Sequence, residues 1–167
     1  MGDSKKILVV MGVSGTGKST IGKMLAKTLK IPFFDGDDFH PEANVKKMSA
    51  GKPLNDGDRQ GWLEKLNALA KEHQSKGAII ACSALKQNYR TLLQNNLKGT
   101  MRFVYLEGSF ELIKSRLEDR KGHFMPLALL KSQFDALEAP IDAIKIPITL
   151  APDKIVKQIV TELAHTD

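Results

Sequence analysis

The feature that most constrains this sequence is an apolar run that ends in a glycine-rich loop and continues into a helical pattern. The loop, Gly12–Ser19, reads G-V-S-G-T-G-K-S and matches the pattern G-x-x-x-x-G-K-[ST]. The apolar run Ile7–Met11 precedes it, and apolar residues with helical spacing follow at Ile21, Met24, Leu25 and Leu29. A strand, a glycine loop and a helix N-terminus surround an anion with backbone N–H groups. We therefore predict a nucleotide site, where Lys18 neutralises the β- and γ-phosphates and the Ser19 hydroxyl ligates Mg²⁺.

The length and the composition are those of one soluble globular domain, which we expect to span residues 1–167. The net charge of +6 could indicate nucleic acid, but Lys and Arg are scattered and aromatic residues are few. We favour a cleft that holds phosphates, with no nucleic-acid partner. No apolar stretch is long enough to span a bilayer, so we expect no membrane partner. The single cysteine, Cys82, fits a protein of the reducing cytoplasm.

Short apolar runs alternate with helical patterns, which predicts an α/β fold with a parallel sheet between two layers of helices. We expect five strands, at Lys6–Met11, Pro32–Asp35, Ala78–Ser83, Arg102–Leu106 and Ile146–Leu150. We expect helices at Lys18–Leu29, Asp58–Gln74, Gln87–Asn95, Ser109–Arg120, Leu127–Leu137 and Asp153–Ala164. Ligands of such sheets bind beyond the carboxyl ends of the strands, so the segments after each strand should carry the chemistry.

Two carboxylates that are two residues apart, Asp35 and Asp37, stand at the end of the second expected strand and just after it. One of them can hold Mg²⁺, directly or through water, while the other accepts a hydrogen bond from a substrate hydroxyl and orients it. The alternative is a polar turn in which Asp38 caps a helix. His40, which comes next, either contacts the substrate or is a core or capping histidine.

The third expected strand ends in Ser-Ala, where many phosphate-loop proteins place an aspartate for Mg²⁺. The metal role therefore passes to Asp35 and Ser19. Lys86 and Arg90 follow at a spacing that puts both on one helix face, where two cations can hold a carboxylate or a phosphate. Arg59 falls in the first turn of an expected helix, where the helix dipole disfavours a cation. This position suggests a partner anion, with an ordinary solvated arginine as the alternative.

The segment Arg116–Phe124 surrounds a glycine with charged residues and is flanked by helical patterns. This composition is typical of a mobile lid, which we place at residues 116–140. A lid brings arginines to the transferred phosphoryl group and excludes water, which would otherwise hydrolyse the nucleotide. The alternative is a solvated turn between two helices.

Taken together, these segments resemble the gluconokinase family, within the P-loop phosphotransferases of the shikimate-kinase and nucleoside-monophosphate-kinase type. The specific part of the resemblance combines D-G-D-x-x-H-P at Asp35–Pro41, C-S-A-L-K at Cys82–Lys86 and R-K-G-H-F at Arg120–Phe124. Further matches occur, in the family's order, at Asn44, Lys47–Met48, Gly51–Asp56, Asp58–Arg59, Trp62–Leu63, Tyr89–Arg90, Ser132–Phe134, Leu137–Glu138 and Pro140.

The resemblance implies transfer of the ATP γ-phosphate to the terminal hydroxyl of D-gluconate, giving 6-phospho-D-gluconate. It implies an ATP site made of Gly12, Val13, Ser14, Gly15, Thr16, Gly17, Lys18, Ser19 and Thr20. Asp37 resembles the base that orients the substrate, and Asp35 resembles a residue that holds magnesium through water, beside Ser19. The implied substrate contacts also include His40, Arg59, Lys86, Arg90 and His123. Arg116 and Pro152 resemble residues at the adenine, and Arg120 and Lys121 resemble catalytic cations of the lid.

Two alternatives stay open at this point. One is a kinase of the same fold that acts on another sugar acid or on a nucleoside monophosphate. The other is a nucleotide-dependent switch or binding module, which the paired aspartates and the expected lid disfavour. Dimers occur in the family that the sequence resembles, so a homodimer is an expectation.

Overall fold

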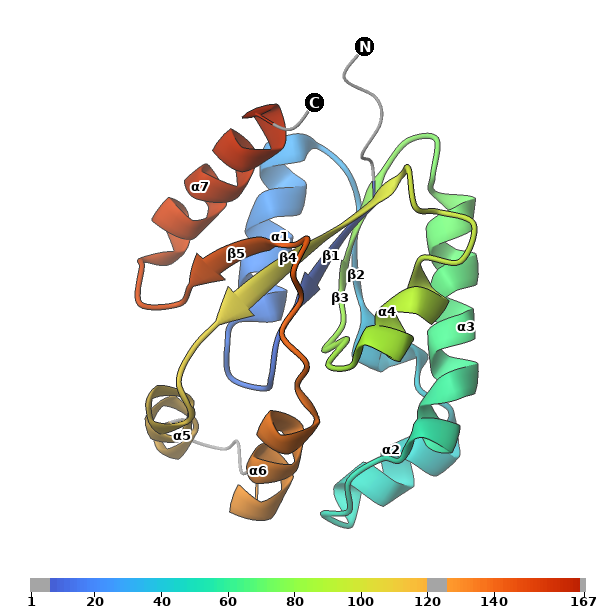
Figure 1. The fold of residues 1–167 in the computed structure, drawn as a ribbon, viewed down its shortest axis with the longest axis vertical. Helices are drawn as coiled ribbons and strands as arrows, with labels where there is room; N and C mark the ends of the chain where they lie inside the picture. Colours follow the sequence, from blue (N-terminus) through green and yellow to red (C-terminus); the bar gives the residue numbers. More distant parts are fainter. Residues whose placement is uncertain (1–6, 120–125, 166–167) are drawn as a thin grey trace.

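The computed structural model describes residues 7–119 and 126–165, which are built around one five-stranded sheet (Figure 1). The strands are β1 (Ile7–Met11), β2 (Phe33–Asp35), β3 (Ala78–Ala81), β4 (Met101–Glu107) and β5 (Ile144–Pro147). All neighbours pair in parallel, in the order β2-β3-β1-β4-β5. The predicted α/β fold with a five-stranded parallel sheet is therefore confirmed, and the loop after the central strand β1 opens at the carboxyl edge.

The helices form a layer on each face of the sheet and a group beyond the carboxyl ends of the strands (Figure 1). They are α1 (Lys18–Leu29), α2 (Glu42–Ser49), α3 (Asp56–Glu72), α4 (Gln87–Leu93), α5 (Phe110–Glu118), α6 (Leu127–Ala136), α7 (Pro152–His165) and the short 3₁₀ helix η1 (Gly36–Phe39). On one face α1 packs against β3 and α7, while α3 and α4 pack together on the other. No helix within the described residues is long and apolar enough to cross a membrane.

Burial explains the inner strands and also the shifted bounds of β5, which begins two residues and ends three residues before its prediction. The strand β3 ends two residues early, and β2 and β4 differ from their predictions by no more than one residue at either end. Every residue of β1 and β3 is buried, as expected for inner strands that are covered on both faces. The edge strand β5 instead alternates, with Ile144 and Ile146 buried and Lys145 and Pro147 exposed. The apolar run on which its prediction rested continues past the strand, because Ile148 is buried in the turn that follows.

Two elements near the carboxyl edge were not predicted, η1 and α2. Only Asn44 is buried in α2, so the helix carries no apolar stripe that a sequence pattern could reveal. The helix α3 begins two residues before its predicted start, because Asn55 caps it. The Asn55 side chain accepts from the Asp58 N–H, and the Asp58 carboxylate accepts from the Asn55 N–H. The predicted cap of α5 is confirmed, since Ser109 Oγ accepts from the Leu112 N–H at 3.1 Å.

Candidate active site

The phosphate loop leaves β1 at Gly12 and enters α1 at Lys18. Gly12, Gly15 and Gly17 have φ angles of 148°, 85° and 91°, which glycine adopts without strain. A Cβ at Gly12 would lie 2.8 Å from the carbonyl oxygen of Leu106 in β4. The loop therefore needs glycine both for its backbone shape and for its close approach to the neighbouring strand.

Hydrogen bonds within the loop hold Lys18 at its mouth. The Lys18 Nζ donates to the carbonyl oxygens of Gly12 and Val13, both at 3.0 Å. The buried Thr16 donates its hydroxyl to the Val13 carbonyl oxygen at 2.9 Å, and Thr20 is exposed in the first turn of α1. The positive end of the α1 dipole and the Lys18 ammonium thus meet at one place, which suits the phosphates of a nucleotide.

Ser19 and Asp35 meet although they are 16 residues apart, with the Ser19 hydroxyl donating to Asp35 Oδ2 at 3.1 Å. Asp35 Oδ1 accepts from the backbone N–H of Asp37 at 3.0 Å and so caps η1. A hydroxyl and one carboxylate are ligands that Mg²⁺ takes beside phosphate oxygens and water, so this pair fits the ion. Across residues 7–119 and 126–165, no group of three or more His, Cys, Asp and Glu side chains offers a second candidate metal site.

Asp37 projects from η1 onto the wall of a cavity, and 79% of its side chain is exposed. Its pKa is raised, first by desolvation against the cavity walls and then by the Asp35 carboxylate, while Lys18 opposes the shift and Asp38 adds to it. Water around so open a side chain limits the desolvation. The raised pKa of Asp37 makes its carboxylate a better acceptor for the proton of a substrate hydroxyl.

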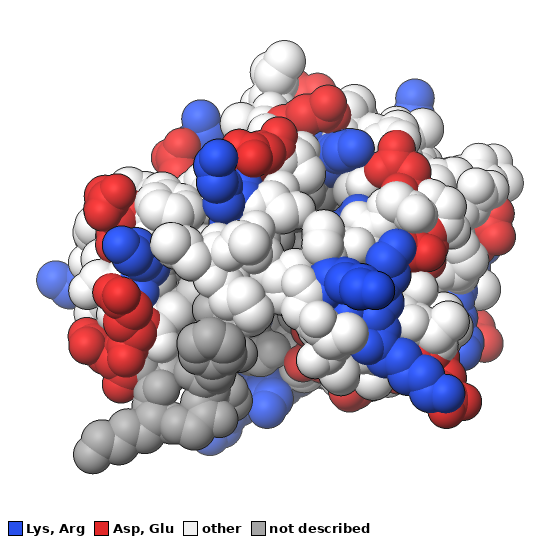
Figure 2. Space-filling model, turned by 90° about the horizontal axis from the view of Figure 1, so that it is seen from below, with Lys and Arg blue, Asp and Glu red and all other residues white. Residues whose placement is uncertain are grey.

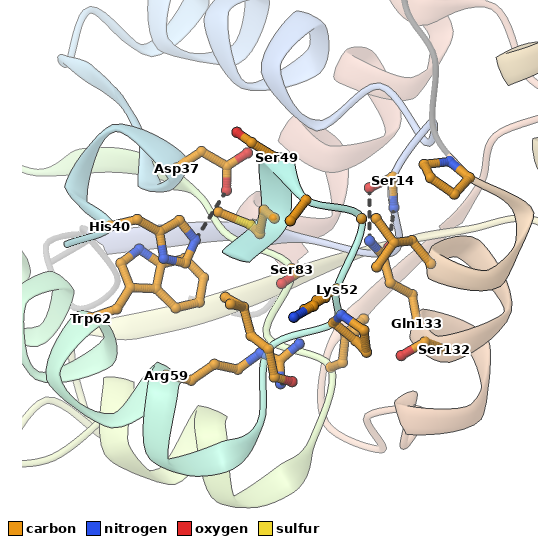
Figure 3. Close-up of a pocket in the computed structure, with 18 of the residues that line it drawn as sticks. Ser14, Asp37, His40, Ser49, Lys52, Arg59, Trp62, Ser83, Ser132 and Gln133 are labelled. Atoms are coloured by element: carbon orange, nitrogen blue, oxygen red, sulfur yellow. Dashed lines mark hydrogen bonds and ion pairs between the residues drawn. The ribbon is translucent and has the colours of Figure 1, made fainter. Parts of the chain in front are cut away.

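His40 lies beside Asp37, with 3% of its side chain exposed and its Nε2 3.7 Å from Asp37 Oδ1 (Figure 3). Its ring stacks on Trp62, with centroids 4.0 Å apart and planes at 19°. Burial lowers the pKa of His40 to about 4, and the nearby Arg59 adds to the shift, so the ring is neutral at pH 7. His40 is therefore packed like a core histidine while it also lines the cavity.

Two cations, Lys52 and Arg59, also line this cavity (Figure 3). Arg59 Nη1 donates to the Leu54 carbonyl oxygen and, at 3.1 Å, to the Tyr89 hydroxyl. The Arg59 guanidinium also lies over the Tyr89 ring, 5.2 Å from its centroid. These contacts fix Arg59 in the first turn of α3, and both oxygens that it bonds are uncharged. Its charge therefore remains available to an anion in the cavity.

The expected placement of Lys86 and Arg90 on one helix face is wrong. Lys86 is the N-cap of α4 and has an extended backbone, so the four-residue spacing of a helix does not apply to it. The Lys86 Nζ pairs with Asp56 Oδ1 at 3.1 Å. Both residues line a hollow that adjoins the cavity and that Arg59 also borders.

Arg90 does not line the cavity that holds Asp37 and Lys18. It is 3% exposed, and it donates to the carbonyl oxygens of Ala84 and Glu138 at 2.7 and 2.8 Å. These bonds join the turn after β3 to the segment after α6. In this structure Arg90 therefore stabilises two segments next to the cavity, because its guanidinium donates to a backbone carbonyl oxygen of each.

The cavity has a volume of about 550 Å³ and lies beyond the carboxyl ends of the strands (Figure 3). The phosphate loop, η1, the loop before α3 and the lid helix α6 supply its walls. It is lined by Ser14, Lys18, Asp37, His40, Met48, Ser49, Ala50, Gly51, Lys52, Pro53, Leu54, Arg59, Trp62, Ser83, Leu85, Pro126, Leu129, Ser132 and Gln133. Its size and its few charged groups are typical of a site for a small polar molecule.

The expected lid contacts the phosphate loop through α6. The Ser14 N–H donates to Gln133 Oε1 at 2.7 Å, and Gln133 Nε2 donates to Ser14 Oγ at 3.0 Å (Figure 3). Three residues that the sequence predicted to act from the lid, Arg120, Lys121 and His123, lie outside the described residues.

Arg116, one of the two residues expected at the adenine, contacts the turn that precedes the other, Pro152. Arg116, near the end of α5, donates to the carbonyl oxygen of Ile148 at 2.7 Å. Ile148 lies in the turn that leads to Pro152, the first residue of α7.

Sequence reasoning gave no role to four residues of the site: Lys52, Asn44, Trp62 and Gln133. All four stand in segments that match the family, so the resemblance could have singled them out. Their roles follow from contacts between elements, which no spacing along the chain reveals.

A phosphate loop between β1 and α1, with a carboxylate and two cations on the walls of the same small cavity, defines a P-loop kinase. Such enzymes are phosphotransferases that take the phosphoryl group from a nucleotide. The acceptor of this one is a small molecule.

Comparison with known proteins narrows the class. The family model for shikimate kinase matches residues 14–163. The chain is 47% identical to the thermoresistant gluconokinase of Escherichia coli K12 over 136 residues, which cover 80% of this chain and 77% of the relative. It is 42% identical to the gluconokinase of Arabidopsis thaliana, over 96% of this chain and 94% of the relative. The crystal structure of a gluconokinase from Sinorhizobium meliloti 1021 superimposes with a TM-score of 0.86 at 38% identity, covering 96% of this chain and 93% of the other. The chain therefore belongs to the gluconokinase family.

Proposed function

We propose that this protein transfers the γ-phosphate of ATP to the terminal hydroxyl of D-gluconate, giving 6-phospho-D-gluconate and ADP. The observation that carries the proposal is the cavity of about 550 Å³, which joins phosphate-loop residues to Asp37 and to two cations. Figure 2 looks onto this end of the molecule and shows Lys and Arg side chains gathered on the side of α2 and α3. An acid substrate with one carboxylate and several hydroxyls suits such a site.

The chemistry needs little covalent work from the protein, because phosphoryl transfer passes through a loose transition state. A bond forms between the substrate oxygen and the γ-phosphorus, and the bond from that phosphorus to the oxygen bridging to ADP breaks. Asp37 orients the hydroxyl and accepts its proton, a contribution of about 10²–10⁴-fold. Lys18 stabilises the negative charge on the phosphates from the mouth of the loop.

Ser19 and Asp35 are the residues that would hold Mg²⁺, through a hydroxyl and a carboxylate oxygen that already meet at 3.1 Å. The ion supplies charge neutralisation and orientation of the β- and γ-phosphates. Because the turn after β3 offers no carboxylate for this purpose, the carboxylate that contacts Ser19, Asp35, takes the role.

Lys52 and Arg59 are our candidates for binding the carboxylate of gluconate. Both line the cavity that also holds Asp37, so a substrate with its hydroxyl at Asp37 can place its acid end near them. Lys86 supports the carboxylate end of the site indirectly. It pairs with Asp56 in the adjoining hollow, and Asp56 accepts a hydrogen bond from the Tyr89 hydroxyl. The same hydroxyl accepts a hydrogen bond from Arg59. His40 completes the wall beside Asp37.

The remaining expectations also stand as proposals. Arg116 and Pro152 bind the adenine, Arg120 and Lys121 act as catalytic cations, and His123 binds the substrate. The one cysteine, Cys82, is a buried free thiol, which accords with a cytoplasmic protein. The expectation of a homodimer is based on the family alone, and sedimentation equilibrium would test it directly.

The proposed function is tested by ADP release with gluconate, shikimate, other sugar acids and nucleoside monophosphates as acceptors. We expect gluconate to stimulate ADP release far more than the others. Stimulation by another acceptor in place of gluconate would refute the proposed substrate, and stimulation by none would refute the kinase assignment.

The anchor residues are tested by Lys52→Ala and Arg59→Ala, with Lys46→Ala as the matched control. Lys46 lies on the neighbouring helix α2, is 75% exposed and pairs with Glu42. We expect the first two variants to raise the KM for gluconate more than the KM for ATP, and the control to change neither. Equal effects on both substrates would remove the anchor role.

A further inference from the structure

Asn44 is a buried polar residue at the edge of the site, 3% exposed and the one buried residue of α2. Its Nδ2 donates to the carbonyl oxygen of Asp58 in α3 at 2.8 Å. A carbonyl oxygen only accepts, so this bond fixes which end of the amide faces the site: the NH₂ group. The same Nδ2 lies 3.2 Å from Nδ1 of His40.

The tautomer of His40 follows from that geometry. Because Asn44 presents an N–H to Nδ1, Nδ1 must be the acceptor, and the proton of the neutral ring sits on Nε2. Nε2 is the ring atom that lies 3.7 Å from Asp37 Oδ1. The N–H of His40 therefore faces one oxygen of the Asp37 carboxylate and leaves the other oxygen free for a substrate hydroxyl.

Trp62 fixes the plane of the same ring. It stacks on His40 from α3, and its Nε1 donates to the Gly36 carbonyl oxygen of η1 at 2.7 Å. The His40 ring is thus held by α2 through its edge and by α3 through its face, while η1 carries the carboxylate that it faces. Arg59, in the first turn of α3, places a positive charge near the ring.

We propose that Asn44 is a positioning residue that holds His40 in the Nε2–H tautomer, and that this N–H orients the Asp37 carboxylate for the acceptor hydroxyl. With the other tautomer, a ring lone pair would face the carboxylate and repel it. The 3.7 Å separation is longer than a hydrogen bond, so the proposal requires this contact to shorten in the substrate complex. Catalytic hydrogen bonds are often long without substrate and tighten when it binds. The orienting role of Asp37 rests on the proposed function, whereas the tautomer does not.

The tautomer is measured by ¹⁵N NMR of the histidine rings in the full chain without substrate, since protonated and unprotonated ring nitrogens differ widely in shift. Wild type should show His40 as Nε2–H at pH 7. Asn44→Leu should populate the Nδ1–H form. The matched control is Asn67→Leu, because Asn67 is also buried and donates to two carbonyl oxygens, of Leu93 and Asn95. It should leave the His40 tautomer unchanged.

The kinetic readout separates positioning from general loss of structure. We expect Asn44→Leu to lower kcat about 10-fold with little change in the KM for ATP, and Asn67→Leu to leave kcat near wild type. In a His40→Gln background, Asn44→Leu should have no additional effect on kcat, because the residue acts through the ring.

An Nδ1–H ring in wild type would overturn the proposal, as would an unchanged tautomer in Asn44→Leu. A shifted tautomer with unchanged kcat would refute the positioning role. Correct tautomers in a protein that does not phosphorylate gluconate would refute the proposed substrate alone, and kcat would then be compared with the acceptor that stimulates ADP release.

Discussion

The burial of His40 predicts a pH dependence of stability that can be isolated with one substitution. The pKa of this histidine falls from 6.5 to about 4 in the folded protein. Because the folded pKa lies below the unfolded one, the fold favours the neutral ring. This stabilisation is complete above pH 6.5 and is lost as the pH falls toward 4.

The magnitude follows from the two pKa values. Each unit of difference corresponds to about 1.4 kcal/mol, and at pH 5 the unfolded ring is almost fully protonated while the folded ring is almost fully neutral. His40 alone should therefore lower the free energy of unfolding by about 2 kcal/mol between pH 7.5 and pH 5. With 3% of the side chain exposed, solvent does little to weaken the effect.

The assay is urea unfolding at the two pH values, followed by circular dichroism and by the fluorescence of the single tryptophan, Trp62. The wild type is compared with His40→Gln, which cannot titrate in this range. The raised pKa of Asp37 acts in the opposite direction, since the fold then gains stability as the pH falls. That contribution is present in both proteins and largely cancels in the difference between them.

We expect the wild type to lose about 2 kcal/mol more than His40→Gln between pH 7.5 and pH 5. If both proteins lose the same free energy of unfolding, the ring is not held neutral by its surroundings. The account of its burial between η1 and Trp62 would then be wrong.

Three further predictions concern the loop, the packing beside Asp37 and the lid. Lys18→Met should lower kcat about 10³-fold while the fold survives, because a close charge pair is worth about 4 kcal/mol at an effective dielectric of 20, and near-normal turnover would contradict this role. Gly36→Ala should lower the free energy of unfolding by about 1–3 kcal/mol, since its Cβ would lie 2.4 Å from a backbone oxygen of β3. Gly61→Ala, with no atom within 4 Å of the added Cβ, is its control in urea unfolding and should not be destabilised. Gln133→Ala should tighten ADP binding about 5-fold in calorimetry. In the wild type the Ser14 N–H must give up its bond to the Gln133 side-chain oxygen before it can bind a phosphate, and the variant removes that cost. Weaker ADP binding by the variant would show instead that Gln133 helps to hold the nucleotide.

The nucleotide half of the site was largely predictable from the sequence. The helix Lys18–Leu29 has its predicted bounds, because a glycine loop and an apolar stripe are local signals. The meeting of Ser19 with Asp35 was also expected, because Ser19 follows one strand and Asp35 ends another, and the carboxyl ends of parallel strands lie at one edge of the sheet. For these residues, knowledge of the strand order was not required.

The half of the site that binds the phosphoryl acceptor was harder to predict from the sequence, as its cations show. Lys86 and Arg90 have helical spacing, but the first is a cap with extended backbone and the second bonds two backbone carbonyls. Lys52, which no pattern marked, lines the cavity instead. A spacing rule describes one helix, whereas the direction of a charged side chain depends on which oxygens neighbouring segments place around it.

By itself, the sequence determined the phosphate loop, the parallel sheet and the family, because these depend on local patterns and on motifs in order along the chain. Only the tertiary structure decided that His40 is buried against Trp62, which tautomer Asn44 selects and which cations face Asp37. The physical reason is that the cavity has walls from several elements far apart in sequence. Packing between those elements sets the distances and the desolvation on which the chemistry depends.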